Sequence, residues 1–100
     1  MGLDATLEDE FGEELDSLED ENGRLAAAWP TGNPSYPVLR HVDLEGTTLL
    51  NRLQLEAALP EFEAFAAAAP ADLKSAAARL LKFARQAAAE QHLYLRFLGD

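Results

Sequence analysis

The sequence predicts an α+β fold, in which a small antiparallel sheet is covered on one face by two antiparallel helices. Two helical patterns follow one another between residues 51 and 91 with only a short link. Short candidate strands precede them, and residues 92–98 are typical of a strand that returns to the sheet. Because a strand needs neighbours, this last segment ties the end of the chain to its earlier part.

The helix predicted over residues 70–91 rests on apolar positions at spacings of three and four, the pattern of one helix face. Pro70 suits the first helical position, and Asp72 suits the first turn, where the helix dipole favours an anion. Alanine is the best helix former, so local propensity agrees with the pattern. The apolar face consists of Leu73, Ala76, Ala77, Leu80, Ala84, Ala87 and Ala88.

The segment His92–Leu98 changes to a period of two, which indicates a strand. Leu93, Leu95 and Phe97 share one face and are expected to point toward the core. Gly99 ends the pattern.

The first helix is predicted over Asn51–Ala69. Asn51 is a favourable N-cap, and Gln54 three residues later is its reciprocal partner in a capping box. Pro60 interrupts the pattern but lies away from the apolar stripe, so a kink toward solvent is tolerable. The stripe consists of Leu55, Ala58, Leu59, Phe62, Phe65, Ala66 and Ala69.

Three strands are predicted before this helix, namely Arg24–Trp29, Val38–Val42 and Thr47–Leu50. The first contains three alanines, which are weak strand formers. Asp20-Glu21-Asn22-Gly23 is a turn signal, because Asn and Gly accept positive φ at low cost. Pro30–Pro37 holds three prolines and a glycine and is predicted to be a loop.

Composition bounds the protein to one domain without disulfides, since the chain has 100 residues and no Cys. It has no apolar run of about 18 residues, so no membrane partner is expected, and a cytoplasmic location is the default. The formal charge is -10. Residues 1–22 hold ten acids and no Lys or Arg, whereas residues 23–100 hold eight of each sign. Nucleic acid is therefore an unexpected partner.

Residues 1–22 are predicted to be an acidic arm or an amphipathic helix, followed by a single α+β domain over 23–100. Apolar residues spaced four, four, four and three give a helical stripe, and Thr6 with Asp9 resembles a capping pair. Like charges one turn apart and Gly12 oppose a helix, which favours a solvated arm. A leading strand is the third alternative. The stripe consists of Leu3, Leu7, Phe11, Leu15 and Leu18.

Two runs of sequence, PSYPVLRHVDLEGTTLLNRLQ (34–54) and YLRFLGD (94–100), resemble a small bacterial protein family to which no activity is attached. The resemblance implies a shared α+β fold. It carries no functional residue across to this chain.

No catalytic motif is present, so no enzyme activity and no cofactor are expected. No serine lies in a strand–turn–helix elbow, and there is no glycine-rich phosphate loop. His41 and Asp43 would share a face of a strand, but with His92 they give three ligands at best, so no metal site is expected. Five basic residues could form a modest patch, although the solvated face of a helix is the favoured interpretation and reception of the acidic segment within the same chain is an alternative use: Arg40, Lys74, Arg79, Lys82 and Arg85.

Three functions remain open. The first is a small acidic interaction protein that masks a basic protein partner, as immunity and antitoxin proteins do. The second is a homo-oligomer, such as a homodimer, joined through a sheet edge or the alanine-rich helix. The third is a small-molecule binder or hydrolase with a pocket near the Pro30–Pro37 loop, formed by Trp29, Tyr36 and His41. The expected partner-binding residues for the first function are Glu8, Asp9, Glu10, Glu13 and Glu14.

Overall fold

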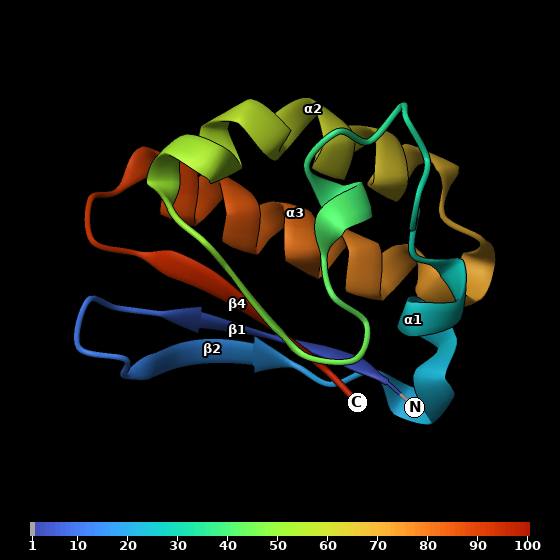
Figure 1. Cartoon of the computed structure of the whole chain (residues 1–100), viewed down its shortest axis with the longest axis horizontal. Helices are drawn as coiled ribbons and strands as arrows, with labels where there is room; N and C mark the ends of the chain where they lie inside the picture. The colour runs from blue at the N-terminus through green and yellow to red at the C-terminus, as the bar shows by residue number, and fades with distance from the viewer. Residues whose placement is uncertain (1) are drawn as a thin grey trace.

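The computed structural model describes residues 2–100 and contains a four-stranded antiparallel sheet with two long helices on one face (Figure 1). The predicted fold class is confirmed. The spatial order of the strands is β2-β1-β4-β3. In chain order they are β1 (Leu3–Glu8), β2 (Glu14–Leu18), β3 (Thr47–Leu50) and β4 (Tyr94–Gly99). The two long helices are α2 (Arg52–Ala68) and α3 (Lys74–Ala89).

The expectation of an arm or a helix over residues 1–22 is wrong, because this segment forms the β1–β2 hairpin. A spacing of four is a multiple of two, so Leu3 and Leu7 share a face in a strand as they would in a helix. Both are buried against the helices, whereas Phe11 is exposed at the loop. The capping pair does not form either, since the Thr6 hydroxyl donates to Glu8. Met1 lies outside the described residues.

Two of the predicted strands are also wrong. Residues Arg24–Ala28 form the short helix α1, because alanines favour a helix and the Asp20 carboxylate accepts hydrogen bonds from the first amides of that helix. Leu39–His41 forms the 3-10 helix η2 in place of a strand. The buried carboxylate of Glu61 on α2 accepts from the amides of Val38 and Leu39, which holds this segment out of the sheet.

The predicted helices are confirmed with small changes at their ends. Asn51 and Gln54 form the expected capping box at the start of α2. Pro60 is exposed on this helix, and the helix continues through it. The second helix begins with the 3-10 turn η3 (Ala71–Leu73) after Pro70 and continues as α3. The two helices run antiparallel, as expected from the short link between them (Figure 1).

Strand β4 lies at the centre of the sheet and carries the core. It pairs with β1 on one side and β3 on the other. Leu95 and Phe97 are fully buried, as predicted, and Leu93 is half-buried just before the strand. His92 lies in the preceding turn with φ +67°, so the strand begins two residues later than expected. Within residues 2–100, no helix is long and apolar enough to cross a bilayer.

Candidate functional site

The loop of the β1–β2 hairpin is held in one conformation by Asp9. The Oδ1 atom of this residue accepts from the amides of Phe11 and Glu13, both at 2.9 Å. Its own amide donates to the Glu13 carbonyl at 3.0 Å, and its carbonyl accepts from the amide of Gly12 at 3.1 Å. Gly12 has φ +78°, a conformation that other residues adopt at a cost. The loop is therefore fixed by four local hydrogen bonds.

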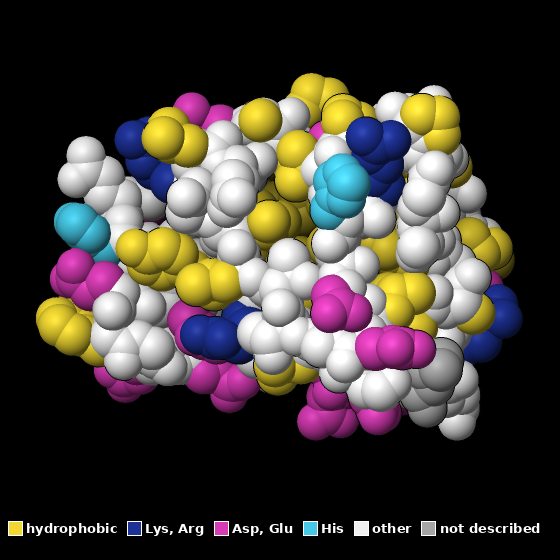
Figure 2. All heavy atoms as spheres, in the orientation of Figure 1, with side chains coloured by type: hydrophobic (Ala, Val, Ile, Leu, Met, Phe, Trp, Pro, Cys, Tyr) yellow, Lys and Arg dark blue, Asp and Glu magenta, His cyan; other side chains and the backbone are white. Residues whose placement is uncertain are grey.

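This fixed loop presents an aromatic ring among carboxylates. Phe11 is 85% exposed, the largest value among the exposed large hydrophobic residues of the described chain. Leu15, just inside β2, is 51% exposed. Figure 2 shows acidic and hydrophobic side chains gathered with a histidine at the left-hand end, where Figure 1 places the hairpin loop. We call this surface the hairpin tip; its members are Glu10, Phe11, Glu13, Glu14 and Leu15.

Two of the five predicted partner-binding acids lie beneath the hairpin tip and serve the fold. Asp9 holds the loop, and Glu8 is only 8% exposed. The carboxylate of Glu8 accepts from the Thr6 hydroxyl at 2.7 Å and from Arg96 Nε at 2.9 Å. Burial raises the pKa of Glu8, but the bonds from Thr6 and Arg96 and the charge of Arg96 outweigh it, so its pKa lies below the ordinary value of 4.5. Glu10, Glu13 and Glu14 remain exposed to solvent.

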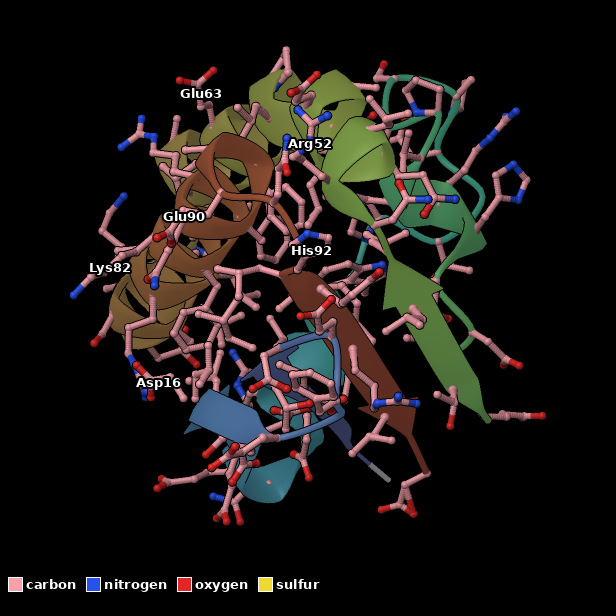
Figure 3. All side chains as sticks on the ribbon, turned by 90° about the vertical axis from the view of Figure 1, so that its left-hand side faces the viewer. Asp16, Arg52, Glu63, Lys82, Glu90 and His92 are labelled. Carbon is pink, nitrogen blue, oxygen red and sulfur yellow. The ribbon has the colours of Figure 1, made fainter. Side chains whose placement is uncertain are left out.

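The turn between α3 and β4 lies beside the hairpin tip. His92 Nδ1 is 3.2 Å from the Glu10 carboxylate. A hollow of about 260 Å³ extends from His92 to the first turn of α2, and its walls include Arg52 and Leu53. Figure 3 looks onto this end of the molecule, with Arg52 and His92 above the hairpin loop. Leu53 is 65% exposed, so a second apolar side chain lies at the same end of the molecule as Phe11.

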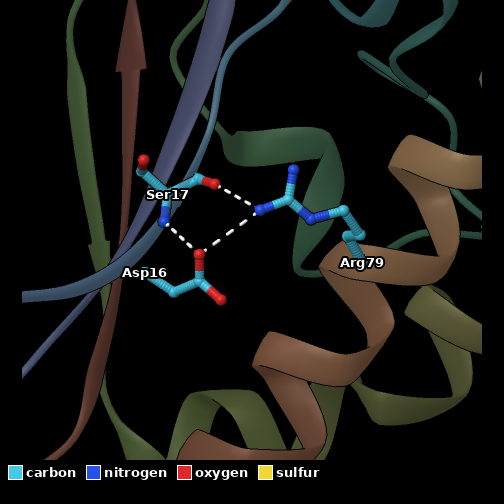
Figure 4. A network of polar contacts seen from close by, with 3 residues as sticks. All are labelled: Asp16, Ser17 and Arg79. Atoms are coloured by element: carbon cyan, nitrogen blue, oxygen red, sulfur yellow. Dashed lines mark hydrogen bonds and ion pairs between the residues drawn. The ribbon is translucent and has the colours of Figure 1, made fainter.

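The hairpin is anchored to α3 by an arginine that the sequence assigned to a basic patch. Arg79 Nη2 donates to the Ser17 carbonyl at 2.6 Å and to Asp16 Oδ1 at 3.3 Å (Figure 4). The guanidinium also lies 5.5 Å from the centroid of the Phe83 ring, within cation–π range. Of the five basic residues, Arg79 is the one for which the structure shows contacts with residues 1–22.

A larger hollow of about 770 Å³ lies between the end of β2 and the start of α3. Its two arginines already have acidic partners, because Arg24 Nε donates to Asp72 at 2.7 Å and Arg79 binds Asp16. The remaining charges in its wall are carboxylates, among them Glu19 and Glu21. The wall of this hollow therefore has no unpaired cation that could bind an anion. Its larger volume alone does not make it a better candidate site than the hairpin tip.

The three residues predicted to form a pocket have different environments. Trp29 is buried, donates through Nε1 to the Leu39 carbonyl at 2.8 Å, and has ring contacts with Phe65 and Phe97 at 5.3 and 5.2 Å. It is therefore an anchor of the core. Tyr36 is half-buried and His41 is exposed. Neither of the two hollows described above is lined by these residues.

The strand geometry that would have aligned His41 with Asp43 is absent, because His41 belongs to η2. Asp43 instead uses Oδ1 to accept from the amide of Glu45 at 2.9 Å. Across residues 2–100, no group of three or more His, Asp or Glu side chains has the arrangement of a metal site.

Comparison with protein families, with curated proteins and with solved structures finds no significant match to this chain.

Two features of this surface were not predicted from the sequence. Phe11 fits the spacing of an apolar helical stripe, although Asp9 and Gly12 occupy the first and fourth positions of a turn, where Asp and Gly are favoured. The pairing of Glu8 with Arg96 joins residues 88 positions apart, and no local pattern could reveal it.

Proposed function

We propose that this chain is an acidic recognition protein that binds a basic protein partner through the hairpin tip, with Phe11 as the anchor. In this proposal the chain masks its partner, as immunity and antitoxin proteins mask the proteins that they bind. The observation that carries the proposal is a ring 85% exposed on a loop fixed by four hydrogen bonds. A fixed loop loses little conformational entropy on binding, and aromatic residues are enriched among the side chains that dominate binding energy.

Charge supports a basic partner. Glu10 and Glu13 lie in the same loop as Phe11, Glu14 begins β2, and all three are exposed. Residues 1–22 contain no Lys or Arg. Such a concentration of one sign accelerates encounter with an oppositely charged surface and fixes orientation, with a smaller effect on the dissociation rate. The aromatic and the acidic residues therefore have separable kinetic roles.

The test uses the protein to capture its partner from cells that encode it, followed by surface plasmon resonance on the purified partner. We expect Phe11→Ala to raise the dissociation rate and weaken binding by about 2 kcal/mol, the size of an interface hot spot. Glu13→Gln with Glu14→Gln should slow association, most strongly at low salt.

The matched control is Glu21→Gln with Glu63→Gln, which removes the same charge from an exposed acid after β2 and an exposed acid on α2, both outside the hairpin tip. This control should bind with nearly unchanged kinetics. Recognition by the hairpin tip would be contradicted if Phe11→Ala left partner binding unchanged. It would also be contradicted if association slowed equally in both double variants.

A further inference from the structure

Strand β3 is an edge strand with unpaired backbone groups. The Gly99 amide donates to the Gly46 carbonyl at 2.6 Å, at the residue pair just before the β3–β4 ladder. Backbone groups alternate in direction along an antiparallel strand, so Thr48 and Leu50 bond to β4. The N–H and C=O groups of Thr47 and Leu49 point away from it. Within residues 2–100 these outward groups have no backbone partner, since β3 pairs only with β4.

The two edges of the sheet differ in charge and regularity. Strand β2, at one edge, carries Glu14 and Asp16 and has an irregular register opposite Leu7 and Glu8. Charges and bulges are the devices by which proteins keep edges from pairing. Strand β3 reads Thr-Thr-Leu-Leu and has no charge, proline or bulge. Only the β3 edge is open to another strand.

We propose that β3 pairs antiparallel with β3 of a second copy, giving a two-fold symmetric dimer with one continuous sheet. This inference is independent of the function proposed for the hairpin tip. In the register that satisfies every outward group, Thr47 of each copy lies opposite Leu49 of the other, and the two Thr48 residues meet at the axis. That register forms four backbone hydrogen bonds and leaves both pairs of long helices on the same face.

The absence of charge on β3 and the two-fold symmetry of the register favour a second copy as the occupant. A chain of formal charge -10 repels its copies, so self-association needs an uncharged contact, and β3 supplies one far along the sheet from β2. Glu45 precedes the strand and Arg52 follows it. In the proposed register Glu45 of each copy lies opposite Asn51 of the other, next to Arg52, whose charge already pairs with Glu56 at 2.8 Å. The flanking residues therefore bring no unpaired like charges together.

The apolar surface beside the edge is small and predicts a weak dimer. Leu49 is 45% exposed and Leu98 is 39% exposed, and both lie on the face of the sheet away from the helices. In the dimer, Thr47 lies between Leu98 of its own chain and Leu49 of the second copy. Pairing therefore extends this apolar strip across the two-fold axis. A four-residue strand buries less than a standard interface, so dissociation in about the micromolar to millimolar range is expected.

Amide hydrogen exchange of the wild-type protein tests the proposal directly. The amides of Thr48 and Leu50 should be protected at every concentration. Those of Thr47 and Leu49 should exchange quickly in dilute solution and about tenfold more slowly when about nine-tenths of the chains are paired. Concentration-independent exchange of Thr47 and Leu49 up to millimolar protein would overturn the dimer. Protection that appears only when a different protein is added would assign the edge to that protein and overturn it equally.

Sedimentation equilibrium of two matched variants gives a second test. Leu49→Lys places one lysine from each copy diagonally across the two-fold axis on the same face of the sheet. These like charges approach each other only in the dimer, so the dissociation constant should rise by about tenfold or more. Leu15→Lys makes the same change at a residue of similar exposure on the β2 edge and should leave the constant unchanged. Equal dissociation by both variants would overturn the proposal. If Leu49→Lys does not fold, Thr47→Pro removes one outward amide without touching the β4 ladder and should weaken the dimer in the same way.

Discussion

Three buried or half-buried carboxylates hold segments of the chain that lie far apart in sequence. Glu61 on α2 binds the amides that begin η2. Asp20 accepts from the amides of Leu3, Leu25 and Ala26, which joins β1 to α1. Glu8 joins β1 to β4 through Arg96. Hydrogen bonds to charged groups contribute about 1.5–3 kcal/mol each, more than exposed ion pairs do.

Glu8 makes stability depend on pH, and the sign follows from its lowered pKa. The ionised form is favoured in the folded state, so its contribution is fully present above the ordinary pKa of 4.5. That contribution is lost as the pH falls through the lower pKa of the folded protein. We expect Glu8→Gln to cost about 1–3 kcal/mol at neutral pH, because Arg96 loses its charged acceptor.

Urea unfolding at neutral pH and at about pH 3 measures this effect. The difference between wild type and Glu8→Gln should shrink as the pH falls. Glu13→Gln, which removes an exposed charge from the same hairpin, should change stability by less than about 0.5 kcal/mol. A penalty for Glu8→Gln that is the same at both pH values would refute the assigned role of its charge.

At the scale of elements, β4 is the strand on which the stability of the fold depends most. It lies between β1 and β3, so its removal divides the sheet and exposes the core face of α3. Leu95 and Phe97 are fully buried, and each such side chain contributes about 1.5–3 kcal/mol. Truncation after Gln91 should therefore abolish cooperative thermal unfolding, as followed by circular dichroism. A truncated chain that melts near the wild-type temperature would contradict this.

The sequence predicted the elements whose signals are local and unambiguous. The capping-box residues Asn51 and Gln54 predicted the start of α2, and the alternation that includes Leu95 and Phe97 predicted β4. The hairpin was missed because its apolar spacing of four fits both helical and strand periods. The short segments were missed because distant carboxylates decide them, as Glu61 does for η2.

The sequence predicted that the candidate site is acidic, but it did not predict which of its side chains are exposed. Composition located the acids before Gly23, yet it could not separate Glu8, which is buried, from Glu13, which is exposed. That distinction depends on Arg96, near the other end of the chain. The exposure of Phe11 follows only once the hairpin is known, because in a helix the same residue would share the stripe of Leu7.

At the scale of the whole molecule, repulsion among the acidic residues destabilises the folded state. The excess acids lie in the hairpin and the turn after it, and Glu14 is the register partner of Glu8. Like charges directly opposite in a sheet are destabilising. The molecule measures 31 × 24 × 22 Å, so at about 0.01 M salt, where the Debye length is about 30 Å, every charge acts on every other.

Salt should therefore stabilise this protein, although it weakens the ion pairs. At about 0.15 M the Debye length is about 8 Å, which screens repulsion across the molecule more than it screens contact pairs such as Arg96–Glu8 at 2.9 Å. The other pairs between carboxylates and arginines are exposed and contribute about 0–1 kcal/mol each. We expect the free energy of unfolding, from urea titrations, to rise by up to about 1 kcal/mol between these two salt concentrations. Glu14→Lys, which relieves the repulsion opposite Glu8, should reduce that rise, and Glu90→Lys should reduce it less. A stability that falls with salt would mean that the ion pairs outweigh the repulsion among the acids.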